Sequence, residues 1–274
     1  MEVVVAENAG FCPGVKHAYN TAINSEPGSK ILGQLVHNPD VSAELKKREI
    51  IEVHSLDEVN DGETIIIRAH GATTSQISEM SQRGMDIVNC TCKKVQRIQH
   101  LADEYSNAGE RVAVFGEKKH PEFKSICSFV GNGAIELSDT LDIEAIEKEI
   151  ESLVLLAQTT SAPDEYEQIK ALLKERVREL KSPNTLCSFT HDALIVAQQL
   201  AAQVDVMLVI GGRNSSNTKN LVTACSDKTP TFHIENEDGL KDIDFRGISR
   251  LGITAGASTP PSTIEKIVQR LKTL

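Results

Sequence analysis

The feature that most constrains the fold is a unit that the sequence repeats three times. Each repeat opens with a cysteine, and the three cysteines are Cys12, Cys92 and Cys187. A helical pattern follows each of them, at residues 13–23, 95–108 and 193–203. A strand-like apolar run comes next, at residues 31–36, 112–116 and 206–211. Self-similarity of this kind takes precedence over any local assignment of secondary structure.

The rest of each repeat also recurs in order. A polar cluster opens a second helix, and a short strand follows at residues 51–53, 134–137 and 231–234. An acidic segment and a fourth apolar strand then lead to a turn of small residues, at 69–74, 157–162 and 254–259. Apolar strands that alternate with helices are typical of parallel sheets covered on both faces. The sequence therefore predicts an α/β protein of three pseudo-equivalent units with mostly parallel sheets.

Composition sets limits on function. The chain has 274 residues, which is about 90 residues for each of three units. Its net charge of −10 and its lack of tryptophan argue against binding to nucleic acid or to anionic membranes. No apolar run approaches the ~20 residues that span a bilayer, and the first residues do not resemble a signal peptide. We expect a cytoplasmic protein with neither a nucleic acid nor a membrane as partner.

The cysteine positions indicate a metal centre. In the cytoplasm, cysteines serve metals or catalysis more often than disulfides. Three thiolates brought together by the repeat, with no fourth partner, would leave one metal position open for chemistry. Cys127 and Cys225 lie in apolar helical surroundings and are interpreted as buried structural thiols. Cys90 lies two residues before Cys92, and a role for it as an additional metal ligand stays open.

The predicted strand ends carry most of the unusual polar residues. Ligands of open α/β sheets bind beyond the carboxyl ends of the strands, where helix N-termini favour anions. The candidate binding and catalytic residues in these loops are His37, His70, His120, Glu122, Thr159, Thr160, Ser215, Ser216, Asn217 and Ser258. Glu122 is the only carboxylate in the polar clusters at residues 36–39, 119–122 and 214–217, which follow the first strand of each repeat. No glycine pattern of a dinucleotide site is evident.

Several short runs resemble one enzyme family along essentially the whole chain. They are Gly-Phe-Cys12-Pro-Gly-Val, Val-His37-Asn, Ala-His70-Gly, Thr-Cys92, His120-Pro-Glu122, Gln158-Thr159-Thr160, Asn214-Ser-Ser-Asn217 and Thr254-Ala-Gly-Ala-Ser258. In these runs the chain is similar to the 4-hydroxy-3-methylbut-2-enyl diphosphate reductases, which catalyse the last step of the methylerythritol phosphate route to isoprenoids. The resemblance implies three α/β units arranged around a central iron–sulfur cluster. The implied domains are 14–92, 93–184, and 185–274 together with 1–13.

The resemblance also implies roles for individual residues. Cys12, Cys92 and Cys187 would hold a [4Fe–4S] cluster whose fourth iron is open to the substrate hydroxyl. The residues implied to bind the allylic diphosphate are His37, His70, His120, Thr159, Ser215, Ser216, Asn217 and Ser258. Glu122 would supply protons through Thr159, with His120 nearby. The reaction would remove an allylic hydroxyl and give isopentenyl and dimethylallyl diphosphate, with electrons from an external donor such as ferredoxin or flavodoxin.

Two departures from the family pattern stand out. Family members usually have Thr-Cys-Pro, whereas Lys93 follows Cys92 here. After the third cysteine an Arg-Gln pair is missing from the run His191-Asp192-Ala193-Leu194. Two alternatives remain open at this point: a three-cysteine iron–sulfur enzyme similar to quinolinate synthase, and a non-catalytic redox sensor that holds a cluster or zinc.

Glu122 is expected to be a proton source. A carboxylate beside a bound diphosphate would have its pKa raised by the like charge, which keeps it protonated near neutral pH. A purely structural role is the alternative, because glutamate in the first turn of a helix stabilises the helix dipole by about 0.3–1 kcal/mol.

Overall fold

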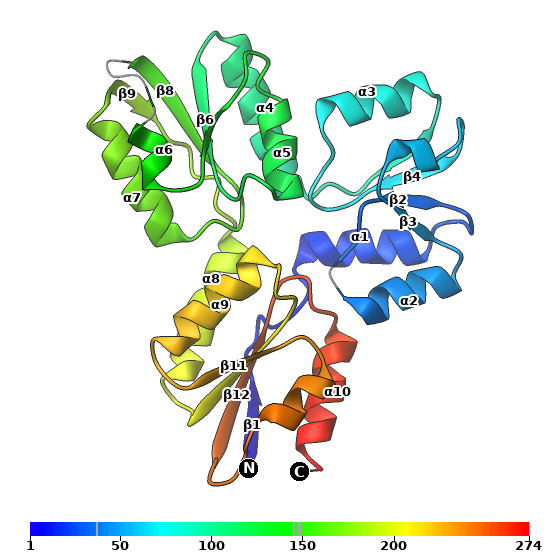
Figure 1. Cartoon of the computed structure of the whole chain (residues 1–274), viewed down its shortest axis with the longest axis vertical. Helices are drawn as coiled ribbons and strands as arrows, with labels where there is room; N and C mark the ends of the chain where they lie inside the picture. The colour runs from blue at the N-terminus through cyan, green and yellow to red at the C-terminus, as the bar shows by residue number, and fades with distance from the viewer. Residues whose placement is uncertain (37, 145, 147–149, 274) are drawn as a thin grey trace. The chain divides into compact units, whose positions relative to one another are not determined.

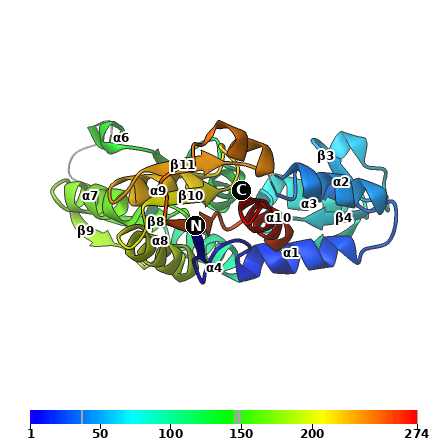
Figure 2. The ribbon, with the colours of Figure 1, turned by 90° about the horizontal axis from the view of Figure 1, so that it is seen from below.

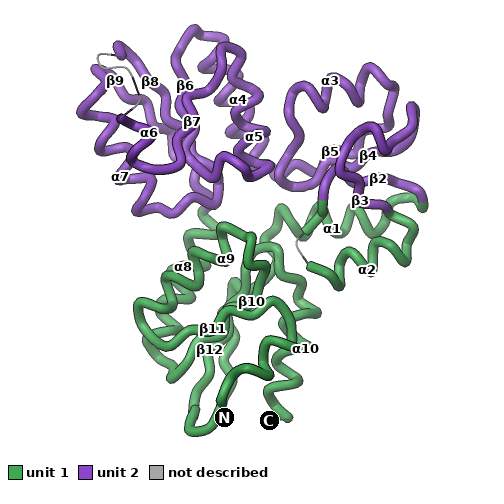
Figure 3. Tube along the Cα trace, viewed as in Figure 1, with its two compact units in different colours: residues 1–27, 34–50, 188–274 green, residues 28–33, 51–187 purple. Residues whose placement is uncertain are grey.

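A computed structural model describes residues 1–36, 38–144, 146 and 150–273 (Figure 1). The chain forms two compact units (Figure 3). The first unit consists of Met1–Pro27, Gln34–Ile50 and Ser188–Leu274, and the second of Gly28–Gly33 and Ile51–Cys187. His37, one of the predicted substrate ligands, lies outside the described residues.

The described strands form three parallel sheets of four strands each. Sheet A, in the first unit, contains β1 (Glu2–Val5), β10 (Val206–Ile210), β11 (Thr231–Ile234) and β12 (Arg250–Ala255). Sheet B, in the second unit, contains β2 (Lys30–Leu32), β3 (Ile51–Val53), β4 (Thr64–Ile67) and β5 (Asp86–Asn89). Sheet C, also in the second unit, contains β6 (Arg111–Phe115), β7 (Ile135–Leu137), β8 (Ile150–Ala157) and β9 (Val177–Lys181).

The three sheets share one topology. Their strand orders are β11-β10-β12-β1, β3-β2-β4-β5 and β7-β6-β8-β9. Sheet A differs only in taking its last strand from the start of the chain, where β1 pairs with β12 in the register Glu2↔Arg250 to Val5↔Ile253. The predicted fold class of three parallel α/β units is thus confirmed, whereas the domain boundaries proposed above stay a prediction.

Helices connect the strands. They are α1 (Pro13–Ile23), α2 (Pro39–Lys47), α3 (Thr74–Gln82), α4 (Lys93–Asn107), α5 (Pro121–Ser128), α6 (Thr140–Glu144), α7 (Pro163–Lys174), α8 (Ser188–Ala201), α9 (Ser216–Ser226) and α10 (Pro261–Leu271). Two of the acidic segments form short 3-10 helices, at Leu56–Glu58 and Glu237–Asp242. In the described part of the chain, no helix combines the length and the apolar character needed to cross a membrane.

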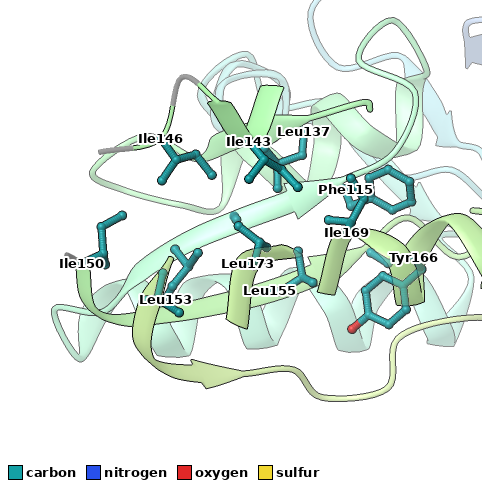
Figure 4. Close-up of a cluster of buried hydrophobic side chains, with 13 residues drawn as sticks. Phe115, Leu137, Ile143, Ile146, Ile150, Leu153, Leu155, Tyr166, Ile169 and Leu173 are labelled. Atoms are coloured by element: carbon teal, nitrogen blue, oxygen red, sulfur yellow. The ribbon is translucent and has the colours of Figure 1, made fainter. Parts of the chain in front are cut away.

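Helices cover both faces of sheets A and C, as the apolar strands require. In sheet C, one face packs against α4 and α5, and the other packs against α6 and α7. Figure 4 shows the second of these cores, in which Phe115 and Leu155 of the sheet meet Ile169 and Leu173 of α7. In sheet A, α8 and α9 pack on one face and α10 on the other. The two chain ends, at β1 and after α10, lie side by side in the first unit (Figures 1 and 2).

One predicted strand is shorter than expected. The apolar run at residues 31–36 predicted a strand, but β2 ends at Leu32. Gly33 has φ of 75°, a left-handed conformation that favours glycine. A Cβ atom at Gly33 would also lie 2.8 Å from the Arg68 guanidinium carbon. The chain therefore turns out of the sheet at this glycine, before the polar loop that leads to α2.

Candidate active site

The three repeat cysteines occupy equivalent positions beside their sheets. Each donates its backbone N–H to a carbonyl oxygen two residues beyond the end of a neighbouring strand. The acceptors are Ala257 for Cys12 (3.0 Å), Ala69 for Cys92 (3.0 Å) and Thr159 for Cys187 (2.9 Å). Those strands end at Ala255, Ile67 and Ala157, respectively. The same local register therefore places a cysteine at the start of α1, α4 and α8.

Two of the other three cysteines, Cys90 and Cys225, are buried, whereas Cys127 is half-buried like the repeat cysteines. Cys12, Cys92 and Cys187 are half-buried, and the sulfur of Cys12 accepts the Val15 N–H at 3.4 Å. Burial, together with the nearby Glu136 carboxylate, raises the pKa of Cys127 to about 12. Burial also raises the pKa of Cys225 to about 11. Cys127 and Cys225 therefore stay protonated at neutral pH, which makes them poor metal ligands.

Cys90 has a backbone role in sheet B. It is 1% exposed, and its N–H bonds to the carbonyl of Ile67 at the end of β4. It lies two residues before its repeat cysteine. Gly10 holds the same position before Cys12, and its N–H bonds in the same way to Ala255 at the end of β12. This equivalence to a glycine indicates that the position needs no thiol.

No group of three or more His, Cys, Asp or Glu side chains within the described ranges is close enough together to hold a metal ion. Cys92 and Cys187 belong to the second unit and Cys12 to the first. Ligation of one cluster by these three thiols stays a prediction. The donor set itself fits an iron–sulfur cluster, because thiolates are its usual ligands and because the three cysteines share one structural position.

A second set of equivalent positions caps the helices that follow the first strand of each repeat. Asn38 caps α2, accepting N–H bonds from Asp40 and Val41 at its side-chain oxygen. His120 caps α5 through Nδ1, which accepts the Glu122 N–H at 3.2 Å. Ser215 caps α9 through Oγ, which accepts an N–H at 3.3 Å. The capping bond fixes the tautomer of His120, because a nitrogen that accepts this bond leaves Nε2 to carry the ring proton.

The second residue of each of these helices is Asp40, Glu122 or Asn217. Glu122 is 3% exposed and Asn217 is 6% exposed, so both lie inside their units. Asp40 is exposed and forms an ion pair with Lys266 at 2.8 Å. The comparison of the three polar clusters in the sequence ended at Pro39 and therefore did not include Asp40. The structure shows that a second carboxylate occupies the helix position of Glu122, but in solvent.

Glu122 is held by Thr159 at both oxygens. The Thr159 N–H donates to Oε1 at 2.7 Å, and the Thr159 hydroxyl donates to Oε2 at 2.9 Å. Burial raises the pKa of Glu122 from 4.5 to about 7, even though these two hydrogen bonds favour the charged form. The expected direction of the shift is correct, but burial causes it before any diphosphate is present.

Thr159 also connects Glu122 to a cysteine. Its carbonyl accepts the Cys187 N–H, while its own N–H and hydroxyl hold the carboxyl group. His70 and His120 form a second contact in the same unit. Their ring centroids are 5.1 Å apart, and the rings meet edge to face at 80°. The second unit thus brings together His70 with His120, and Glu122 with Thr159 and the backbone of Cys187.

The first unit holds the remaining predicted ligands. Ser215 and Ser216 lie at the N-terminus of α9, directly before the buried Asn217. Ser258 follows Ala257, the residue that accepts the Cys12 N–H. By the same register, His70 and Thr160 are the equivalents of Ser258 in the other two sheets. Thr160 was among the candidates at the strand ends in the sequence, but the family resemblance gave it no role.

Comparison with known proteins identifies the family. A model of the LytB protein family matches residues 3–272. The chain belongs to the LytB protein family. A LytB relative from Clostridioides difficile (strain 630) is named 4-hydroxy-3-methylbut-2-enyl diphosphate reductase and is 37% identical over 279 residues, with 100% of both chains covered. A relative of the same name from Caldanaerobacter subterraneus is 34% identical, covering 100% of this chain and 98% of the relative.

Solved structures of similar proteins agree with the LytB assignment. One is (E)-4-hydroxy-3-methyl-but-2-enyl diphosphate reductase, described as the terminal enzyme of the non-mevalonate pathway. It matches with a TM-score of 0.75 and 32% identity over 100% of both chains. The E-1-hydroxy-2-methyl-but-2-enyl-4-diphosphate reductase from Plasmodium falciparum matches with a TM-score of 0.89 and 21% identity, covering 99% of this chain and 88% of that one. At that identity the second likeness supports the fold alone.

Proposed function

We propose that the protein is an iron–sulfur 4-hydroxy-3-methylbut-2-enyl diphosphate reductase. It would remove the allylic hydroxyl of its substrate as water, using two electrons and two protons, and release isopentenyl or dimethylallyl diphosphate. Full-length similarity to LytB relatives with this name supports the proposal. The family assignment also favours this reaction over the quinolinate-synthase-like enzyme and over the redox sensor.

The observation that carries the proposal is the Glu122–Thr159–Cys187 connection. Thr159 binds the buried carboxyl group with its N–H and hydroxyl, and the backbone of a cysteine with its carbonyl. The proposed proton donor, Glu122, and a proposed iron ligand, Cys187, are thus both hydrogen-bonded to Thr159. A carboxyl group with a pKa of about 7 is half-protonated at neutral pH, which suits a general acid.

Cys12, Cys92 and Cys187 would hold the [4Fe–4S] cluster. Their equivalent positions before helices α1, α4 and α8 support this assignment, since a helix N-terminus favours a nearby negative charge. When bound, such a cluster supplies electrons one at a time and a Lewis-acidic iron for the substrate hydroxyl. Electrons would come from an external donor such as ferredoxin or flavodoxin.

Glu122 would deliver protons through Thr159. When Glu122 is protonated, its O–H would donate to the Thr159 hydroxyl oxygen, and the Thr159 O–H would turn toward the leaving hydroxyl. Thr159 would then pass its own proton on and take one from the Glu122 carboxyl group. Protonation makes the leaving group water rather than hydroxide, which is a strong base and leaves poorly. The second proton would add to a carbon atom of the reduced substrate and give the alkene product.

The diphosphate would be bound by side chains that donate hydrogen bonds. His70 and His120 would contribute from the second unit, with Thr159. His37 and four residues of the first unit would complete the set, namely Ser215, Ser216, Asn217 and Ser258. Binding energy from this remote group would position the reacting carbon.

Anaerobic purification followed by absorption and EPR spectroscopy tests the cluster, and turnover with the allylic diphosphate tests the reaction. Glu122→Gln should keep the spectra and substrate binding but lose about 10²-fold or more of turnover, because the amide has no transferable acid proton. Glu265→Gln, the same change at an exposed residue of α10, is the control and should turn over like the wild type. Near-normal turnover of Glu122→Gln would show that the protons come from elsewhere.

A further inference from the structure

The second unit contains a cavity of about 190 Å³ at the carboxyl ends of β2, β3 and β4. The start of α3 and the start of α5 complete its walls. The two helices are in contact, because the Thr74 N–H at the start of α3 donates to the Ser128 hydroxyl at the end of α5 at 3.0 Å. The walls are therefore tied together within one unit.

Cationic side chains converge on this cavity. Arg68 follows β4, Lys119 precedes α5, and Lys124 lies on its first turn. His54 lines the cavity from the end of β3. The described lining residues include no carboxylate. The chain has 39 acidic and 29 basic residues, so the charge of this wall is opposite in sign to the net charge of the protein.

The charge on the wall is only partly compensated. Arg68 is largely removed from solvent and packs against Gly33; burial lowers its pKa, and attraction to Glu52 opposes that shift. Lys119 and Lys124 form no ion pair with any residue in the described ranges, and both are exposed at the mouth of the cavity. Three cations around one hollow repel each other, and an anion between them would turn that repulsion into charge-assisted hydrogen bonds.

Polar groups that suit oxygen ligands complete the lining. Thr73 and Gln76 form a capping box at the start of α3, so this helix end presents hydroxyl and amide groups to the cavity. We propose that this cavity is a second anion site, which binds the phosphate or diphosphate group of a small molecule through Arg68, Lys119 and Lys124.

The site is distinct from the proposed substrate residues but lies directly behind two of them. None of the proposed diphosphate ligands is among the described lining residues. Gly71 of the lining follows His70, and Lys119 and Pro121 flank His120. An anion that bridges Arg68 to the two lysines would therefore restrain both histidine loops, whose rings are in contact.

Titration calorimetry of the anaerobically isolated protein with inorganic diphosphate tests the site, and inorganic phosphate is the second arm. The wild type should bind two equivalents of diphosphate. Lys119→Gln/Lys124→Gln should weaken one of these sites at least tenfold, because each lost charge-assisted hydrogen bond costs about that much or more. Asn217→Ala should weaken the other site instead. Arg68→Met, which removes the guanidinium group beside Gly33 and keeps an unbranched side chain, should act like the double lysine variant.

Lys46→Gln/Lys47→Gln is the matched control, since it removes the same charge from α2, none of whose residues is among those that line the cavity. It should bind like the wild type. Equal affinity for phosphate and diphosphate would identify free phosphate as a sufficient ligand, and a preference for diphosphate would point to an organic diphosphate. If the wild type binds only one equivalent of diphosphate, and only Asn217→Ala weakens that binding, the proposal is wrong. So does unchanged binding in the double lysine variant, or an equal loss in the control. The result does not depend on turnover or on the cluster, so it is separable from the proposed reductase activity.

Discussion

Replacing Glu122 by glutamine should make the protein more stable at alkaline pH than at acidic pH, relative to the wild type. In the folded protein, burial raises the pKa of Glu122 from 4.5 to about 7. Glutamine resembles the protonated carboxyl group in shape. Its oxygen can accept the Thr159 N–H, and its amide can donate to the Thr159 hydroxyl oxygen, so both hydrogen bonds survive.

The sign follows from proton linkage. Between pH 4.5 and about 7 the folded protein holds the Glu122 proton while the unfolded chain has released it. The stabilising contribution is fully present below pH 4.5 and is lost as the pH rises through about 7. With about 1.4 kcal/mol for each pH unit between these two values, the loss is about 3 kcal/mol.

The variant has no such loss, so its stability relative to the wild type should rise with pH. The rise between pH 5 and pH 8 should be about 2.5 kcal/mol, because part of the loss has already occurred at pH 5. Urea unfolding at the two pH values measures it. Far-UV circular dichroism is the appropriate signal because the chain has no tryptophan.

Glu265→Gln controls for the loss of one negative charge, since Glu265 is exposed on α10. Its free energy of unfolding relative to the wild type should be the same at both pH values. If Glu122→Gln also showed a constant difference, Glu122 would have an ordinary pKa, and its proposed role as a neutral acid near pH 7 would lose its basis.

Three further predictions concern the cluster, the anion and the core. Changing any repeat cysteine to serine should lose or destabilise the iron–sulfur absorption, whereas Cys90→Ser should keep it; equal iron loss in Cys90→Ser would refute the assignment. Asn217→Ala should weaken substrate binding by roughly tenfold to a hundredfold with the cluster spectrum intact, because one hydrogen bond to a charged group is lost; unchanged affinity in a titration would contradict this. Leu155→Ala should destabilise the protein by about 2–5 kcal/mol in urea unfolding, because Leu155 is fully buried in sheet C; a change below 1 kcal/mol would show that the core collapses around the gap.

Much of the fold could be predicted because the three repeats share the same pattern of apolar, polar and turn-forming residues. Strand β10 is apolar throughout, and glycine and a polar cluster that caps α9 follow it. Helix α1 begins and ends where the pattern predicted, at Pro13 and Ile23. The early end of β2 was missed because its cause is tertiary: the turn at Gly33 is set by close packing against Arg68, which is distant in sequence.

The sequence singled out Glu122 as a candidate but did not show what would raise its pKa. Glu122 was selected from its neighbours in sequence, and its pKa was expected to depend on the charge of a ligand. The structure shows that burial raises it, since α5 packs against sheet C through Phe123 and Ile126. Burial of one side chain depends on which helix face meets the sheet and on the Thr159 loop, and neither is visible in a short motif.

The repeat also explains how one framework can place three different chemistries at equivalent points. The second residue of the helix after the first strand is Asp40, Glu122 or Asn217, and in each repeat the preceding residues supply the cap. An ionised carboxylate at this position gains from the helix dipole when it is exposed, as Asp40 is in its ion pair with Lys266. The same group loses more from desolvation when it is buried, which is why the pKa of Glu122 is raised in spite of the helix N-terminus and two hydrogen bonds. A buried amide such as Asn217 carries no charge and stays a hydrogen-bond donor at every pH. Burial and residue type at a shared backbone position therefore decide whether the side chain forms an ion pair, has a raised pKa or stays uncharged at every pH.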